Sequence, residues 1–165
     1  KESMACAGFS HWLARSIGAD AQQAWLTGFM LRLGELIIAQ QEPDKLAIIE
    51  KLPHAPGGRW EREVDQTGFT EGHVVGELVR RWNFPQEVVR GLQFSSDPLS
   101  SKRFSRLGGI VHIAMLLAEI GVESTTTPQD TINALPADVL KQLQLDHEWL
   151  QNNLPDVNTF TDTAA

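Results

Sequence analysis

The sequence predicts an all-α fold, formed as one compact multi-helix domain. Apolar residues recur at spacings of three and four along most of the chain, which is the period of an α-helix, and no long alternation typical of a strand occurs. Pro, Gly, Asp and Thr residues separate these periodic segments, as they do at helix ends. With 165 residues, 42% hydrophobic and 21% charged, the chain fits one globular domain of ordinary size.

The first part of the chain predicts three helices. The first helix ends at Gly18, and Asp20 caps the second, with Gln23 at the capping-box position. Pro43 starts a short third helix that runs through Ile49. The buried stripe of the second helix is expected to consist of Trp25, Leu26, Phe29, Met30, Leu33, Leu36 and Ile37.

A loop and two helices are predicted in the middle of the chain. Pro and Gly residues indicate a loop over 52–58, and Thr70 is the expected N-cap of a helix that ends near Trp82. Pro85 then starts a helix that reaches Phe94, and residues 95–99 form a loop. We expect Trp82 and Pro85 to form a packed joint between these two helices.

The last part of the chain contains the most apolar segment. We expect a helix from about Ser101 to Ile120, in which Gly108 and Gly109 allow a neighbouring backbone to approach closely. A linker over 124–128 precedes two short helices, over 130–134 and 136–143, and a last helix through Trp149 and Leu150. The residues after Pro155 are predicted to form a flexible tail.

Charge and composition exclude several classes of protein. The net charge is −7, from 14 Lys+Arg against 21 Asp+Glu, so a nucleic-acid partner is not expected. The basic cluster of Lys102, Arg103 and Arg106 is interpreted as the solvated start of a helix. No apolar run approaches the ~20 residues of a membrane span, no signal peptide is visible, and Cys6 is a single cysteine, so we expect a cytoplasmic protein.

Five short motifs follow one another in a specific order. They are Ala24–Gly34, Gly68–Glu71, Gly76–Pro85, Ser95–Pro98 and Val111–Met115. This order resembles the HDOD domain (HD-related output domain), a bacterial signalling module and a degenerate relative of the HD phosphohydrolase superfamily. The resemblance covers roughly residues 1–150, so residues 1–154 are interpreted as the HD-like, C-terminal part of such a domain and 155–165 as the tail. HDOD domains usually carry a further helical region before this part, and we expect the chain to be a fragment that lacks it.

The resemblance also implies where a metal would bind in the superfamily. The ligand positions fall on Glu2, Leu31, Arg32, Glu71, Ser95, Ser96 and Met115. Leucine offers no lone pair and arginine carries its own positive charge, whereas a metal needs several converging O, N or S donors. We therefore expect no metal, no cofactor and no catalysis at this vestigial site. Arg32 is predicted to pair with Glu2, Glu71 or both, the alternative being that it reaches solvent.

Three further residues are candidates for a functional role. His112 lies in the most apolar helix and is expected to be a structural histidine bonded to backbone rather than a ligand. Cys6 is expected to be a small buried residue rather than a nucleophile. Trp60, beside Gly57 and Gly58, is either a core residue or an exposed contact residue for a partner.

The leading functional hypothesis is a non-catalytic signal-transduction domain that works through protein interactions. What the resemblance implies for partners is receiver, GGDEF or EAL domains, as in response regulators and cyclic-dinucleotide enzymes. The alternative is a degenerate phosphohydrolase that keeps nucleotide or cyclic-dinucleotide binding without turnover. An active metal-dependent phosphodiesterase is disfavoured by the missing ligands.

Overall fold

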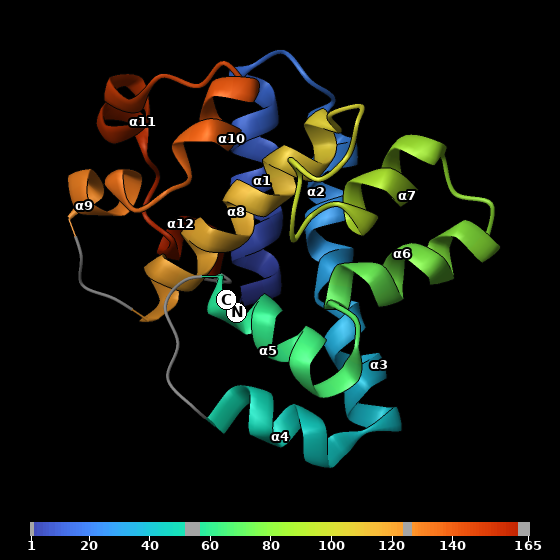
Figure 1. Ribbon diagram of the computed structural model, residues 1–165. Helices are drawn as coiled ribbons and strands as arrows, with labels where there is room; N and C mark the ends of the chain where they lie inside the picture. Colours follow the sequence, from blue (N-terminus) through green and yellow to red (C-terminus); the bar gives the residue numbers. More distant parts are fainter. Residues whose placement is uncertain (1, 52–56, 124–126, 162–165) are drawn as a thin grey trace.

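The computed structural model describes residues 2–51, 57–123 and 127–161. Within these residues the chain forms helices and no strand, so the predicted all-α fold is confirmed (Figure 1). The helices are α1 Glu2–Ser16, α2 Ala21–Leu31, α3 Leu33–Gln41, α4 Pro43–Lys51, α5 Gly58–Thr67, α6 Glu71–Arg81, α7 Gln86–Gln93, α8 Arg106–Glu123, α9 Pro128–Asn133, α10 Ala137–Gln142, α11 His147–Asn153 and α12 Asn158–Thr161. None of these helices is long and apolar enough to cross a bilayer.

Helices α1 and α8 lie side by side at the centre of the molecule. The helices α9 to α12 pack on one flank, α6 and α7 lie on the other, and α3 to α5 form the lower part in the view of Figure 1. Fully buried side chains from α1, α8 and α10, including Leu13, Ile113 and Leu140, form the core. Because α8 is covered on several sides, its apolar residues extend around the helix instead of along one stripe.

The second predicted helix is divided in two, and its buried face differs from the prediction. The helix is interrupted at Arg32, and the α2 face that meets α1 carries Ala24, Thr27 and Gly28. A Cβ atom on Gly28 would lie 2.5 Å from Ser10 Oγ, so small residues are needed for this close approach. Two predicted core residues are consequently on the outside: Leu26 is 43% exposed and Leu36 61% exposed.

Helix α5 was not predicted from the sequence. Residues 52–56 of the predicted loop lie outside the described residues, Gly57 has a left-handed backbone with φ +83°, and α5 starts at Gly58. The buried side chains of α5 are Arg59, Trp60 and Glu63. Two of these are charged, so the helix shows no apolar stripe in the sequence.

The prediction that Trp82 forms a packed joint is wrong. Trp82 is 60% exposed, and Pro85 is exposed as well. Asn83 has φ +59°, which turns the chain sharply, and the amide of Phe84 then donates to Val79 O at 3.0 Å. The side chain that packs against the core at this turn is therefore Phe84, and the ring of the exposed Trp82 lies 6.3 Å from the Phe84 ring, centroid to centroid.

Helix α8 starts later than predicted, at Arg106 instead of Ser101. Residues 101–105 are not helical, and the guanidinium of Arg90 donates to Ser101 Oγ and to Arg103 O. The exposed Lys102 and Arg103 thus lie in the loop before the helix. A Cβ on Gly109 would lie 2.6 Å from Phe104 Cζ, so the close neighbour there is a side chain instead of the expected backbone. At Gly108 a Cβ would lie 3.4 Å from the Gly91 carbonyl oxygen, an ordinary contact distance.

The end of the chain is more ordered than the predicted flexible tail. Residues 158–161 form α12, and the ring of Phe160 packs edge-on against Phe9, with centroids 4.9 Å apart. Gly8 provides the room, since a Cβ there would lie 2.2 Å from the Phe160 ring. The last four residues of the predicted tail, 162–165, lie outside the described residues.

A buried ionic cluster as candidate functional site

Arg32 lies at the bend between α2 and α3, where it ends one helix and begins the next. Its side chain is only 4% exposed. Nη1 donates to Glu71 Oε2 at 3.4 Å, and Nη2 lies 3.7 Å from Glu119 Oε1. The predicted pairing of Arg32 with Glu71 is confirmed, whereas the side chain of Glu2 lies outside the described residues.

The two carboxylates reach Arg32 from different helices. Glu71 is the first residue of α6 and is fully buried, and Glu119 comes from α8 and is 4% exposed. A Cβ on Gly34 would lie 2.2 Å from the Glu71 carbonyl oxygen, so this glycine lets α3 approach the start of α6. Burial of a charge is costly unless a partner compensates it, and Arg32 supplies that partner to both carboxylates.

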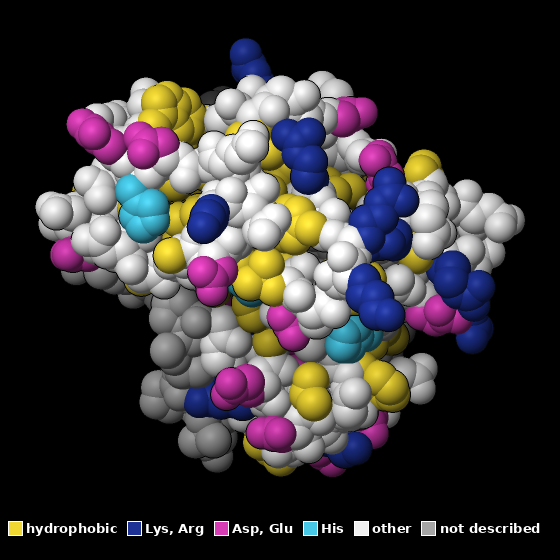
Figure 2. All heavy atoms as spheres, turned by 45° about the horizontal axis from the view of Figure 1, so that its top comes forward, with side chains coloured by type: hydrophobic (Ala, Val, Ile, Leu, Met, Phe, Trp, Pro, Cys, Tyr) yellow, Lys and Arg dark blue, Asp and Glu magenta, His cyan; other side chains and the backbone are white. Residues whose placement is uncertain are grey.

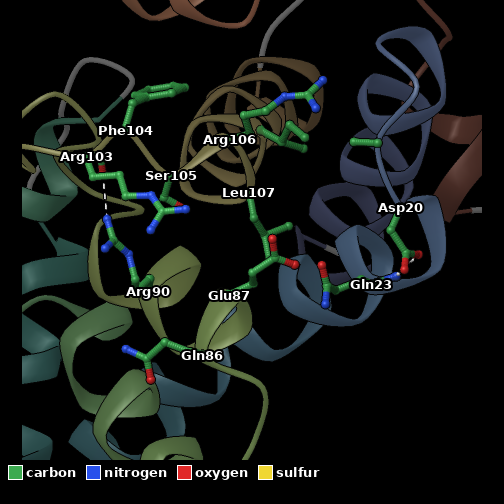
Figure 3. Close-up of a pocket in the computed structure, with 12 residues that line it drawn as sticks. Asp20, Gln23, Gln86, Glu87, Arg90, Arg103, Phe104, Ser105, Arg106 and Leu107 are labelled. Carbon is green, nitrogen blue, oxygen red and sulfur yellow. Dashed lines mark hydrogen bonds between the residues drawn. The ribbon is translucent and has the colours of Figure 1, made fainter.

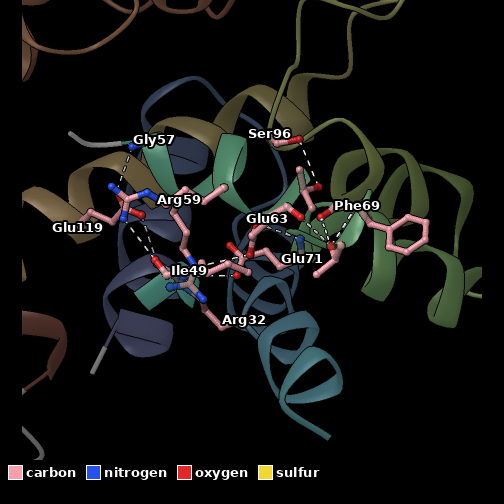
Figure 4. A network of polar contacts seen from close by, with 12 residues as sticks. Arg32, Ile49, Gly57, Arg59, Glu63, Phe69, Glu71, Ser96 and Glu119 are labelled. Carbon is pink, nitrogen blue, oxygen red and sulfur yellow. Dashed lines mark hydrogen bonds and ion pairs between the residues drawn. The ribbon is translucent and has the colours of Figure 1, made fainter. Parts of the chain in front are cut away.

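A second pair extends the cluster through α5. Arg59 Nε lies 3.5 Å from Glu63 Oε2, one helical turn away, and both side chains are buried. The other Glu63 oxygen, Oε1, accepts from the amide of Glu71 at 3.2 Å. The amide of Gly57 donates to Glu119 Oε2 at 3.0 Å. Figure 4 shows these groups converging from α5, α6, α8 and the α2–α3 bend.

Other positions at which the resemblance places metal ligands lie near the start of α6. A Cβ on Gly72 would lie 2.4 Å from Ser95 Oγ and 3.4 Å from Leu31 Cδ1, so these two side chains meet beside Glu71. Ser96 Oγ donates to Thr70 Oγ1 at 3.4 Å.

Met115 is the vestigial-site position on α8. It is fully buried, four residues before Glu119, and therefore on the same helix face. Met115 therefore lies one helical turn from Glu119, a member of the buried cluster.

The cluster combines buried cations and buried anions. Its polar groups are two guanidinium groups and three carboxylates, from Arg32, Arg59, Glu63, Glu71 and Glu119. No three His, Cys, Asp or Glu side chains of the described residues are placed to share one metal ion. At the centre a guanidinium stands against carboxylates, an arrangement that binds helices together electrostatically.

Trp60 is a core residue, and its interpretation as an exposed contact residue is wrong. It is 8% exposed, and its ring stacks on His112 with centroids 4.7 Å apart. His112 Nδ1 lies 2.7 Å from Ser95 O, and because a carbonyl only accepts, this nitrogen carries the hydrogen. The expected backbone-bonded histidine is confirmed. Burial lowers the pKa of His112, against the opposing effects of the Ser95 hydrogen bond and the charge of Asp97.

His73 and Cys6 contribute to the structure, His73 to a helix cap and Cys6 to the core. His73 completes a capping box, in which its Nδ1 accepts from the Thr70 amide at 3.1 Å while its own amide donates to Thr70 Oγ1. Burial lowers the pKa of His73. Cys6 is fully buried in the core between α1 and its neighbours, as expected.

Sequence reasoning missed three members of the cluster, Arg59, Glu63 and Glu119. Glu119 had a usable signal, because it is a single charged residue inside the most apolar helix, where a buried carboxylate requires a partner. Arg59 and Glu63 are four residues apart, the spacing of a helical ion pair, but the helix that carries them was itself not predicted.

The described helices form an all-α domain with a buried ionic cluster. A family model for the HDOD domain matches residues 1–98, which is more than half of the 165 residues. The chain therefore belongs to the HDOD family. None of the curated proteins matches it.

Three solved structures share the fold. A predicted phosphohydrolase from Shewanella amazonensis SB2B has a TM-score of 0.71 at 23% identity, over 93% of this chain and 56% of its own. A predicted signal transduction protein from Marinobacter aquaeolei VT8 has a TM-score of 0.75 at 20% identity, and the match covers 97% of this chain and 35% of that protein. The MmoQ response regulator from Methylococcus capsulatus str. Bath has a TM-score of 0.54 at 18% identity, and the match covers 88% of this chain and 59% of that protein. The chain thus spans less than two thirds of each of these proteins.

Proposed function

We propose that this domain is a non-catalytic regulatory module of bacterial signal transduction, in which Arg32 occupies a vestigial metal site. The observation that carries the proposal is the contact of Arg32 with Glu71 and Glu119 in a buried position. A fixed cation at this place repels a divalent metal and engages the carboxylates that could have bound it. The domain then keeps its fold without a metal and communicates through protein contacts.

The similar structures support a signalling context for this proposal. Two of them are named as a signal transduction protein and a response regulator, and both are longer than this chain. We propose that the partners are receiver, GGDEF or EAL domains, within the same polypeptide or in separate proteins. A third relative is named as a phosphohydrolase, so an enzymatic function is the alternative that an experiment must exclude.

Metal analysis and a hydrolysis assay test the non-catalytic part of the proposal. We expect the purified protein to carry no stoichiometric transition metal after dialysis. We also expect no hydrolysis of bis(p-nitrophenyl) phosphate or cyclic dinucleotides with added Mn²⁺, Mg²⁺ or Zn²⁺. Metal-dependent hydrolysis that is abolished in Glu71→Gln would refute the proposal that the domain is non-catalytic. The Glu148→Gln variant is the matched control, because it makes the same change at an exposed residue outside the cluster.

Binding measurements test the regulatory part. Titration with isolated receiver, GGDEF and EAL domains of the same organism should give saturable binding to at least one of them. Thermal-shift measurements with cyclic dinucleotides examine the alternative of a degenerate nucleotide-binding phosphohydrolase. The alternative would be favoured over our proposal by two results together. A cyclic dinucleotide would stabilise the native protein but not Arg32→Met, and none of the protein domains would bind.

A further inference from the structure

A hollow of about 530 Å³ lies between the α1–α2 turn, α7 and the start of α8. Three arginines from different segments line this α7–α8 hollow. They are Arg90 of α7, Arg103 of the loop that precedes α8, and Arg106 of α8. On the face shown in Figure 2, Lys and Arg side chains gather over the middle and right of the molecule. This gathering is notable in a protein whose net charge is −7.

The three arginines have no carboxylate partner among the described residues. Elsewhere on the surface, Arg80 and Arg81 both pair with Glu77, at 2.7 Å and 3.2 Å. In the hollow, Arg90 donates to Ser101 Oγ at 2.9 Å and to Arg103 O, and Arg106 donates to Ile17 O at 3.0 Å. These bonds to neutral groups hold Arg90 and Arg106 in place without neutralising their charge, so the hollow keeps a local positive field.

The other walls of the hollow offer acceptors. Glu87 and Gln86 come from the start of α7, and Gln23 comes from α2. One oxygen of Asp20, Oδ1, accepts from the backbone amide of Gln23 at 3.0 Å, and the carboxylate adds a further acceptor and a negative charge to these walls. Figure 3 shows Arg90 and Arg103 beside each other at one end of the hollow, with Glu87 and Gln23 further along. Its polarity therefore changes from cationic at one end to hydrogen-bond accepting at the other.

The start of α8 adds to the cationic end. This helix has 18 residues and begins at Arg106, and the amide of Gly108 is capped by Ser105 Oγ at 2.9 Å. The first amides of a helix carry a partial positive charge and attract anions. Here the helix start only reinforces the arginines, which are the main feature of the site.

We propose that the α7–α8 hollow binds a small phosphate ester that also carries hydroxyl groups, with the phosphate at Arg90 and Arg103 and the hydroxyls donating to Glu87 and Gln23. A volume of about 530 Å³ is within the range of small-molecule sites. Guanidinium groups match the geometry of phosphate oxygens, and a carboxylate accepts from sugar hydroxyls. The site is distinct from the buried Arg32 cluster, whose residues do not line it, and it does not depend on the function proposed above.

Titration of the whole chain with ribose 5-phosphate, followed by amide chemical shifts, tests this proposal. Ribose and inorganic phosphate are the comparison probes. We expect saturable shifts around the hollow with ribose 5-phosphate, weaker binding of phosphate and none of ribose. Arg103→Gln should weaken ribose 5-phosphate binding at least about tenfold, as for loss of one charge-assisted hydrogen bond. Because the Arg103 side chain is exposed and only its backbone oxygen accepts from Arg90, the variant should fold normally.

Two further variants separate specific binding from general charge attraction. Arg81→Gln makes the same change of net charge away from the hollow and should leave binding unchanged. Glu87→Gln should weaken binding of ribose 5-phosphate without weakening that of inorganic phosphate. Three outcomes would overturn the proposal: no saturable shifts, equal losses in Arg103→Gln and Arg81→Gln, or tight binding only of a phosphorylated protein segment.

Discussion

Substitution of Arg32 by methionine would leave two buried carboxylates facing each other without their cation. Met has a long side chain that fills much of the same space, so the main change is electrostatic. Two unit charges about 4 Å apart attract by about 4 kcal/mol at an effective dielectric constant of about 20, and Arg32 has contacts of 3.4 Å and 3.7 Å. Part of this attraction only offsets desolvation, and breaking a buried pair costs ~3–5 kcal/mol. We expect Arg32→Met to lose about that much unfolding free energy.

Urea denaturation and thermal unfolding measure the loss. For a domain of this size ~1 kcal/mol corresponds to ~2–4 °C, so the Tm should fall by ~6–20 °C. The matched control is Arg81→Met. The Arg81 side chain is 72% exposed and pairs with Glu77 at the surface, so this control should change stability by less than ~1 kcal/mol.

Removal of the carboxylates separates an electrostatic effect from a loss of packing. In the background of Glu71→Gln and Glu119→Gln, Arg32→Met should cost clearly less than it does in the native chain, because no carboxylate is left uncompensated. This comparison remains informative even if the single variant unfolds. Equal costs in both backgrounds, or a loss below ~1 kcal/mol in the native chain, would show that Arg32 does not stabilise the cluster through its charge.

Three other predictions follow from the burial of particular side chains. Trp82→Ala should cost less than ~1 kcal/mol, whereas Trp60→Ala should cost ~3–5 kcal/mol, in the same urea assay; similar losses would contradict their opposite burial. The pKa of His112 is lowered below 6.5, so its folded form binds fewer protons. The contribution of the neutral His112 to stability should be complete above pH ~6.5 and be lost as the pH falls through that lowered pKa. The unfolding free energy should therefore decrease less steeply with falling pH in His112→Asn than in the native chain. Gly34→Ala should cost ~1–3 kcal/mol despite a better helix propensity, because the new methyl group meets the backbone of Glu71; unchanged stability would show that α3 can move away.

Local hydrogen bonds were the features of this fold that could best be predicted. The caps at Asp20 and Thr70 link residues three positions apart, and both are present. The end of α6 and the start of α7 are also set locally, by the left-handed backbone of Asn83 and by Pro85 at the N-cap of α7. Such signals need no knowledge of the rest of the molecule, because donor and acceptor belong to one turn.

The candidate site could be predicted only in part. A buried arginine requires an anionic partner, and this rule together with the family resemblance identified Glu71 as the partner of Arg32. Glu119 comes from a helix almost 90 positions later, and Arg59 and Glu63 come from a helix that the apolar pattern did not indicate. Their participation depends on how α5 and α8 pack around the start of α6, which spacing along the chain does not encode.

The sequence by itself determined that this protein is helical and where several of its helices are capped, and it led to the hypothesis that Arg32 stands where the superfamily has a metal ligand. The tertiary structure decided which side chains are inside. Leu26 and Trp82 are outside, whereas Phe160 from the predicted tail packs on Phe9. The physical reason is that helical periodicity reports one face of a helix, while burial depends on the neighbours that cover it. Small residues such as Gly8 and Gly28 determine where a neighbouring segment can pack, because they leave room for close approach at their own positions.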